Sequence, residues 1–124
     1  VEAPALFEAV AAESPKKIAS FRSEQLARTV WAYATAGFEA LALFEAVAAE
    51  APKKIETFLP QELANTVWAY ATVGVKAPLL FEAAAAKAAK NMATFNEQNM
   101  ANMVWAYATA GIAAPALFEA VAAE

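Results

Sequence analysis

The side chains best suited to chemistry in this chain are polar ones that change identity at a fixed spacing. Arg28, Asn65 and Asn102 stand 37 residues apart. Arginine and carboxamide side chains can each form two hydrogen bonds with the edge of a nucleotide base. In modular RNA readers, each repeat addresses about one base through two or three such side chains. These three positions are therefore candidate contacts to single-stranded RNA.

A second polar set recurs three residues earlier and consists of Gln25, Glu62 and Asn99. Its residue types suit the same hydrogen bonding to bases, so we count it among the candidate RNA contacts. Two other interpretations stay open for both sets. The side chains could form a ladder that satisfies backbone groups between neighbouring repeats, or they could simply be variable surface positions.

Lysines also recur at one position, which holds Lys16, Lys53 and Lys90. Stacked repeats would align them as a basic ridge that could follow a phosphate backbone. The alternative is a helix surface linked by ion pairs, because Glu13 and Lys17, like Glu50 and Lys54, have the favourable Glu-first order four residues apart.

An acidic row of glutamates recurs as well and contains Glu8, Glu45, Glu82 and Glu119. Paired carboxylates can hold a metal or transfer protons, but these come from equivalent sites on successive repeats and have no His or Asp beside them. We interpret them as a solvated face.

Composition excludes most catalytic chemistry. The chain has no Cys and no His, which removes disulfides, thiolate zinc sites, imidazole acid–base chemistry and the usual catalytic triads. It also lacks a glycine-rich phosphate loop. We therefore expect no enzyme activity, catalytic residue, metal or cofactor. The formal net charge of −4 argues against binding a polyanion through bulk charge, so RNA binding would need a local surface.

The elements that must position these side chains follow from an internal repeat. The signature VWAYAT, then any residue and Gly, occurs three times, with Trp31, Trp68 and Trp105 37 residues apart. Residues 1–37, 38–74 and 75–111 form three full units, and 112–124 open a fourth. A fixed period of this length is typical of stacked architectures. Much of the 60% apolar content is alanine, the best helix former. We predict an all-α fold, an α-solenoid of helix-turn-helix repeats, in one domain over 1–124 that we expect to be a segment of a longer array.

Each unit is predicted to contain two helices. Helix A begins at Pro4, Leu41, Pro78 and Pro115, and helix B begins near Ser23, Pro60 and Glu97. Gly37, Gly74 and Gly111 should end each helix B in the left-handed conformation. Pro15 and Pro52 should kink or divide helix A, whereas Ala89 leaves it smoother in the third unit.

The aromatic residues of helix B are predicted to have different roles. Trp31, Trp68 and Trp105 lie in an unchanging apolar setting, so we expect them to pack in the core between helices A and B. Tyr33, Tyr70 and Tyr107 are expected to turn outward from the core stripe and to have a structural role, although a phenol near the rim could also hydrogen-bond across repeats or contact a ligand.

The ends and the longest uncharged stretch carry two further expectations. The chain starts and stops at one phase of the repeat, without a polar unit to shield the stack, so we expect neighbouring repeats or protein partners at both ends. Residues 98–118 are long enough for a membrane span but contain several polar residues and are interrupted by Gly111 and Pro115. We expect no membrane-spanning segment.

The segment from Phe58 to Gly74, F-x-P-Q-E-L-A-N-T-V-W-A-Y-A-T-x-G, resembles the octotricopeptide and heptatricopeptide repeats, and the likeness extends over essentially the whole chain. The resemblance implies sequence-specific binding of single-stranded RNA in chloroplasts or mitochondria, in transcript stability, processing or translation. The alternative is a structural or assembly subunit of a large organellar complex, such as a photosystem or ribosome, that acts as a protein scaffold.

Overall fold

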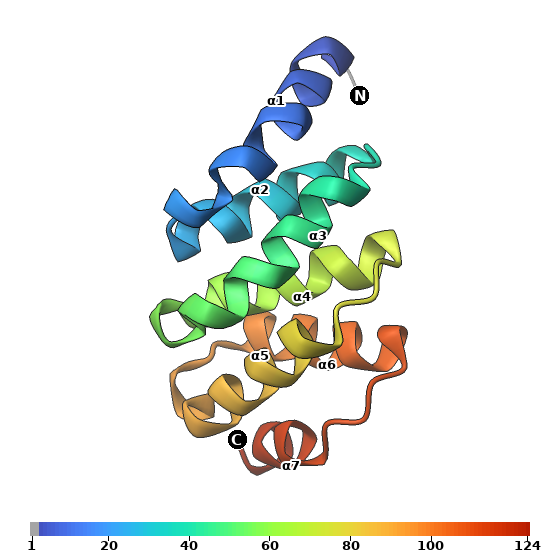
Figure 1. Ribbon diagram of the computed structural model, residues 1–124. Helices are drawn as coiled ribbons and strands as arrows, with labels where there is room; N and C mark the ends of the chain where they lie inside the picture. The colour runs from blue at the N-terminus through green and yellow to red at the C-terminus, as the bar shows by residue number, and fades with distance from the viewer. Residues whose placement is uncertain (1–2) are drawn as a thin grey trace.

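The computed structural model describes residues 3–124, which form helices joined by short connections, with no strand among them (Figure 1). The first helices of the units are α1 (Pro4–Lys17), α3 (Leu41–Glu50), α5 (Pro78–Lys90) and α7 (Pro115–Ala123). The second helices are α2 (Ser23–Ala36), α4 (Pro60–Val73) and α6 (Glu97–Ala110). Three 3₁₀ segments connect the two helices of a unit, namely η1 (Ile18–Ser20), η2 (Ala51–Thr57) and η3 (Met92–Thr94). The predicted all-α hairpin architecture is confirmed.

The helix boundaries follow the local signals in the sequence. Proline occupies the first position of α1, α4, α5 and α7, where its missing N–H had no helical partner to lose. Gly37, Gly74 and Gly111 end α2, α4 and α6 with φ of 70°, 75° and 70°. This left-handed conformation favours glycine because a side chain would clash with the following carbonyl.

The two internal prolines of the first helices act differently. Pro52 coincides with the end of α3 and the start of η2, so helix A of the second unit is divided as predicted. Pro15 does not divide helix A, because α1 continues through it to Lys17, and the predicted alternative of a kink stays a prediction. Pro15 lies within the last turn of α1, where losing one backbone hydrogen bond costs the helix little. In the third unit α5 runs without interruption to Lys90.

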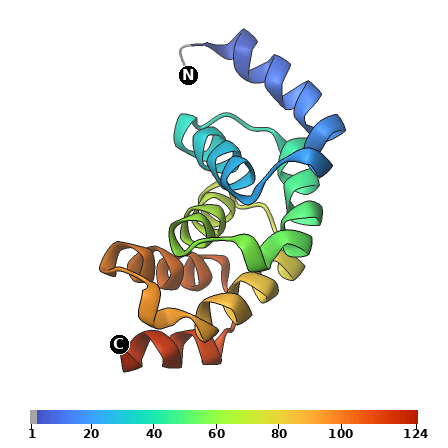
Figure 2. The same ribbon diagram turned by 90° about the vertical axis from the view of Figure 1, so that its left-hand side faces the viewer.

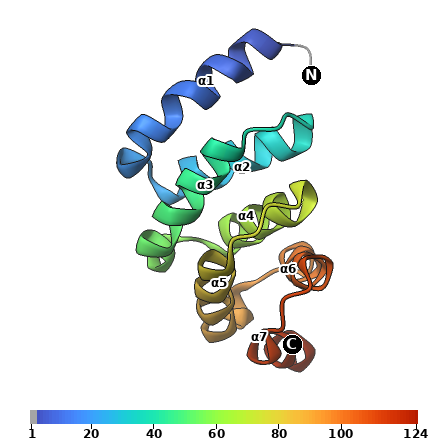
Figure 3. The same cartoon turned by 45° about the vertical axis from the view of Figure 1, so that its right-hand side comes forward.

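The helices form two layers of a curved stack. Helices α2, α4 and α6 lie side by side in one layer, and α1, α3 and α5 lie in the other (Figure 2). The α2–α4 and α4–α6 pairs pack more closely than α1–α3 or α3–α5, which places α2, α4 and α6 on the inside of the curve. Helices α1 and α7 lie at opposite ends of the stack (Figure 3). This arrangement is an α-solenoid. No helix within residues 3–124 has the length and apolar character needed to cross a bilayer.

The core prediction for helix B is wrong for Trp31 and Trp105 but holds in part for Trp68, which packs against the core, and the tyrosines are structural but do not turn outward. Tyr33, Tyr70 and Tyr107 are buried, whereas Trp31 and Trp105 are 42% and 46% exposed. The reason is the angular position of each residue around the axis of helix B. Counted from buried Leu26, Tyr33 is seven residues on, which returns to the same helix face, whereas Trp31 is five residues on and points elsewhere.

Each buried tyrosine connects helix B to helix A of its own unit. The Tyr33 hydroxyl donates to the Phe7 carbonyl at 2.5 Å, and Tyr70 and Tyr107 donate in the same way to the Phe44 and Phe81 carbonyls. The rings meet edge to face, with centroids 4.9–5.0 Å apart. Burial raises the pKa of all three hydroxyls above the ordinary tyrosine value. The tyrosines, which we call the tyrosine seam, thus pack between helices A and B of each unit, the role predicted for the tryptophans.

Polar contacts connect successive units. The contacts between the first and second units differ from those between the second and third units. The Lys54 ammonium pairs with Glu50 at 3.2 Å and donates to the Ala19 and Phe21 carbonyls of the first unit at 2.8 and 2.5 Å. At the next junction, Lys87 of the third unit pairs with Glu56 of the second at 3.3 Å. The expected pairing of Glu50 with Lys54 is confirmed, whereas Glu13 pairs with Lys16, not with Lys17.

Candidate nucleic-acid interface

Arg28, Asn65 and Asn102 occupy equivalent positions on α2, α4 and α6 of the inner layer. Because these three helices pack side by side, the three side chains recur from one helix to the next. Arg28 is exposed, and Asn65 and Asn102 are half-buried. The Asn102 Oδ1 atom accepts a hydrogen bond from Gln98 Nε2 at 3.1 Å. That bond leaves the Asn102 amide NH₂ group to donate elsewhere, and it orients the amide along the helix surface.

Tryptophans form a second row beside the first. Trp31, Trp68 and Trp105 lie three residues after Arg28, Asn65 and Asn102, and residues three apart are neighbours on a helix surface. Trp31 and Trp105 are exposed and Trp68 is half-buried. Ring-to-ring contacts among the described residues involve only Phe and Tyr. Trp31 and Trp105 therefore expose indole surface on which unstacked bases could stack, whereas Trp68 packs in part against the hydrophobic core.

A groove between α2 and α4 joins the two rows. Its volume is about 460 Å³. Its lining includes Arg28, Trp31, Gln61 and Asn65, together with Glu24, Ala27, Leu59 and Glu62. A guanidinium, a carboxamide and an indole thus face one space, which is the combination that can hydrogen-bond the edge of a base and stack on its face.

The second predicted set has a structural task that the sequence left open. The side-chain oxygens of Gln25, Glu62 and Asn99 accept hydrogen bonds from the backbone N–H groups of Arg22, Leu59 and Asn96 at 2.9, 2.9 and 3.3 Å. In α6 the bond is reciprocal, since the Asn99 N–H donates to Asn96 Oδ1 at 2.7 Å. These side chains satisfy backbone groups of their own unit at the helix start, not groups of a neighbouring unit. Contact with RNA by this set remains a prediction.

Lys16 and Lys90 of the lysine row lie in the last turns of α1 and α5, and Lys53 lies in η2 just after α3. Lys16 pairs with Glu13 at 3.0 Å and Lys53 pairs with Glu50 at 3.7 Å, both with exposed ammonium groups. Lys90 is exposed at the end of α5. No hydrogen bond or ion pair within residues 3–124 connects this row to Arg28, Asn65 or Asn102. Exposed pairs of this kind contribute about 0–1 kcal/mol, so a phosphate group could displace them.

The acidic row is exposed along the outer-layer helices, at Glu8, Glu45, Glu82 and Glu119. Within residues 3–124 no three carboxylates approach closely enough to hold a metal ion.

Sequence reasoning missed two kinds of residue. The exposed tryptophans were assigned to the core, although their angular position on the helix pointed away from Leu26. The leucine before helix B of the second unit, Leu59, is 62% exposed and lines the groove. The sequence did contain a signal for this exposure, because the equivalent positions in the other two units hold polar residues, Arg22 and Asn96.

Comparison with known proteins places the chain, not a particular surface, in a family with an RNA-related name. A search of curated proteins finds none that matches the chain. The profile of one family does match, over residues 6–124, and that family is described as RNA-editing substrate-binding complex 6 protein, RESC6. The match supports a helical, RNA-related family and does not test the resemblance to octotricopeptide or heptatricopeptide repeats. With nearly its whole length covered by the profile, this chain belongs to the RESC6 family.

Proposed function

We propose that the chain binds single-stranded RNA along the inner-layer helices, as a non-catalytic component of an RNA-editing substrate-binding complex. The observation that carries the proposal is the pair of adjacent rows on α2, α4 and α6. Exposed or half-buried tryptophans stand one helical turn from Arg28, Asn65 and Asn102. The name of the family supports this role, since it refers to an editing substrate.

The tryptophan row and the row of Arg28, Asn65 and Asn102 would contribute to RNA recognition in different ways. Indole rings accept any base by stacking, which contributes about 1–3 kcal/mol per base. The arginine and asparagine side chains would then select among bases through hydrogen bonds to the base edge. At one base per unit, the three complete hairpins would address about three nucleotides. Because the first unit has Arg28 where the other two units have asparagine, it would prefer a different base.

Electrostatics favour a mode of binding with weak salt dependence. The groove beside Arg28 also contains Glu24 and Glu62, so it is not a basic channel. Phosphate contacts would come from Lys16, Lys53 and Lys90. Each phosphate contact to a single strand changes the slope of log K against log salt by about −0.7, so three give about −2. A protein that bound RNA mainly through charge would show a much steeper slope.

We further propose that the chain acts in an organelle, and that this organelle is the mitochondrion, where RNA-editing complexes act. The chloroplast, which the sequence resemblance also allowed, has no support from the family match.

Fluorescence anisotropy with a labelled single-stranded RNA tests the proposal. The triple substitution Trp31→Ala, Trp68→Ala and Trp105→Ala should weaken binding by at least about tenfold. A matched control replaces exposed alanines at one repeat position of the outer layer, Ala12, Ala49 and Ala86, with serine and should bind as the wild type does. Unchanged affinity in the tryptophan variant and in an Arg28→Ala, Asn65→Ala, Asn102→Ala variant would exclude the proposed surface.

The alternative is a protein scaffold within a large organellar complex, and one observation favours it. Leu41 and Leu79 are 58% and 71% exposed on the second and third hairpins, leaving apolar surface uncovered. Affinity purification after nuclease treatment separates the two roles. Partners that persist without RNA would favour the scaffold, and loss of all partners would favour RNA binding.

A further inference from the structure

The groove between α2 and α4 differs in charge from the equivalent place between α4 and α6. Among its lining residues are three charged side chains, those of Glu24, Arg28 and Glu62. The positions 37 residues later, at the junction of α4 with α6, hold the neutral residues Gln61, Asn65 and Asn99. The two junctions share the same helix packing without sharing these charges. The charged side chains are therefore not needed for packing, and they distinguish the first junction as a binding surface.

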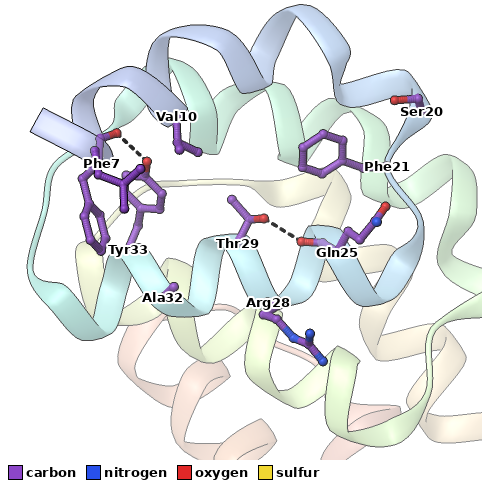
Figure 4. A pocket seen from close by; sticks show the side chains of 10 residues that line it. Phe7, Val10, Ser20, Phe21, Gln25, Arg28, Thr29, Ala32 and Tyr33 are labelled. Carbon is purple, nitrogen blue, oxygen red and sulfur yellow. Dashed lines mark hydrogen bonds between the residues drawn. The ribbon is translucent and has the colours of Figure 1, made fainter. Parts of the chain in front are cut away.

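The Arg28 side chain points from α2 towards α4. Figure 4 shows Arg28 on one side of α2 and Val10 of α1 on the other. Glu24 stands four residues before Arg28, an order that favours an ion pair along a helix. Both side chains are nevertheless exposed, and no ion pair among residues 3–124 involves either of them. The guanidinium and the carboxylate are therefore both available to a ligand in the groove.

The charge balance of the groove disfavours a phosphate group. The Glu62 Oε1 atom accepts a hydrogen bond from the Leu59 N–H at 2.9 Å, which holds this carboxylate beside the groove. Glu24 adds a second carboxylate, so negative charge exceeds positive charge around Arg28. A phosphate would be repelled by both carboxylates, whereas a neutral base would not be. Arg28 is therefore better placed to contact a base than the RNA backbone.

A guanidinium beside a carboxylate suits one base in particular. Guanine is the one standard base with two adjacent acceptors, O6 and N7, on one side and two adjacent donors, N1–H and the N2 amino group, on another. Arginine donates to O6 and N7 in its most frequent specific base contact. A carboxylate can accept from N1–H and N2, and a single-stranded base exposes both edges. Residues four apart on a helix have Cβ atoms about 5–6 Å apart, so Glu24 and Arg28 can reach two edges of one base.

We propose that the groove between α2 and α4 is a guanine subsite. The inference rests on the proposed function, because it requires RNA to lie on the inner-layer helices. Arg28 donates to O6 and N7, Glu24 accepts from N1–H and N2, and the base stacks on the exposed Trp31 ring. The equivalent positions between α4 and α6 offer guanine no charged partner. The chain therefore selects guanine at one junction and not at the next.

Fluorescence anisotropy with short uridine-rich RNAs that differ at one central base tests the subsite. The wild type should bind the RNA with guanine at least about fivefold more tightly than RNAs with adenine or uracil there, the low end of discrimination by a bidentate base contact. Two modified bases test the two contacts in the wild-type chain. 7-Deazaguanine lacks N7, hypoxanthine lacks the N2 amino group, and each should bind more weakly than guanine.

Two substitutions assign these contacts to side chains. Arg28→Lys keeps the charge and loses the planar fork, so guanine and 7-deazaguanine should bind this variant equally while its affinity for the uracil RNA is unchanged. Glu24→Ala should bind guanine and hypoxanthine equally. Glu45→Ala removes an exposed glutamate from the outer-layer helix α3 and is the matched control, which should keep the full guanine preference.

The outcomes separate this subsite from the proposed function. Equal affinity of the wild type for guanine, adenine and uracil RNAs would overturn the subsite and leave RNA binding in place. A guanine preference that survives both Arg28→Lys and Glu24→Ala would overturn it as well, and so would a wild type that binds the two modified bases as tightly as guanine. Failure to bind any of these RNAs would overturn the proposed function together with the subsite.

Discussion

The tyrosine seam leads to a prediction about which aromatic residues hold the hairpins together. Tyr70 is fully buried, its hydroxyl donates to the Phe44 carbonyl, and its ring meets the Phe44 ring edge to face at 5.0 Å. Tyr70→Ala empties the volume of a large side chain between α3 and α4. Cavities of this kind cost about 3–5 kcal/mol of the free energy of unfolding.

Two further substitutions separate the parts of that effect. Tyr70→Phe keeps the ring and removes only the hydroxyl, so it should cost about 0.5–1.5 kcal/mol, the usual net value of one hydrogen bond. Trp31→Ala should cost less than Tyr70→Ala, about 1–2 kcal/mol, because 42% of Trp31 is already in water. Urea unfolding followed by far-UV circular dichroism measures all three. A Trp31→Ala penalty equal to or larger than that of Tyr70→Ala would contradict the packing role of the tyrosines, since tryptophan would then be the main packing residue.

Three other perturbations probe the contacts described above. Lys54→Met should destabilise the fold by about 2–3 kcal/mol in urea melts, because it removes the charged link between the first two hairpins. Combination with Glu50→Gln should cost less than the two separate penalties together, and additive penalties would contradict the proposed pairing. Gly74→Ala should cost roughly 1–2 kcal/mol from backbone strain alone, since φ is 75° and the added Cβ meets no atom within 4 Å. A melt unchanged by this substitution would contradict the left-handed assignment. Raising the pH above about 10 should destabilise the chain, because the unfolded tyrosines ionise there while the raised pKa of Tyr70 and Tyr107 keeps them neutral in the fold. Replacing Tyr33, Tyr70 and Tyr107 with Phe should remove that part of the alkaline loss, and an unchanged pH profile would count against the seam.

Helix boundaries could be predicted from sequence because their signals are local. Proline at a first turn and glycine after a last turn act through backbone geometry alone, so the starts at Pro4 and Pro78 and the end at Gly74 required no knowledge of neighbours. Pro15 shows where such local reasoning fails. The cost of a proline depends on how many helical hydrogen bonds remain after it, and this depends on where the surrounding structure ends the helix.

The candidate site was less predictable because it depends on packing between units. The repeat period identified Arg28, Asn65 and Asn102 as one position whose residue type varies between repeats while the surrounding sequence changes little. The assignment of Trp31 to the core followed its hydrophobicity and ignored its angle from Leu26, and the assignment of Tyr33 to the outside made the opposite error. The use of Lys54 as a link between hairpins had no sequence signal beyond its partner Glu50, because its other partners are backbone carbonyls of another unit.

Stacking of bases on the inner-layer tryptophans beside Arg28, Asn65 and Asn102 is the interaction on which the proposed function rests. Its most direct test follows the three indole N–H signals of Trp31, Trp68 and Trp105, together with the side-chain amides of Asn65 and Asn102, by nuclear magnetic resonance during titration with a short single-stranded RNA. RNA binding in this mode should produce saturable shifts of these signals at one common affinity, while the signals of the outer-layer residues Ala49 and Ala86 do not shift. Saturable binding that shifts only outer-layer signals, or no shift of the indole signals at any RNA concentration, would contradict it.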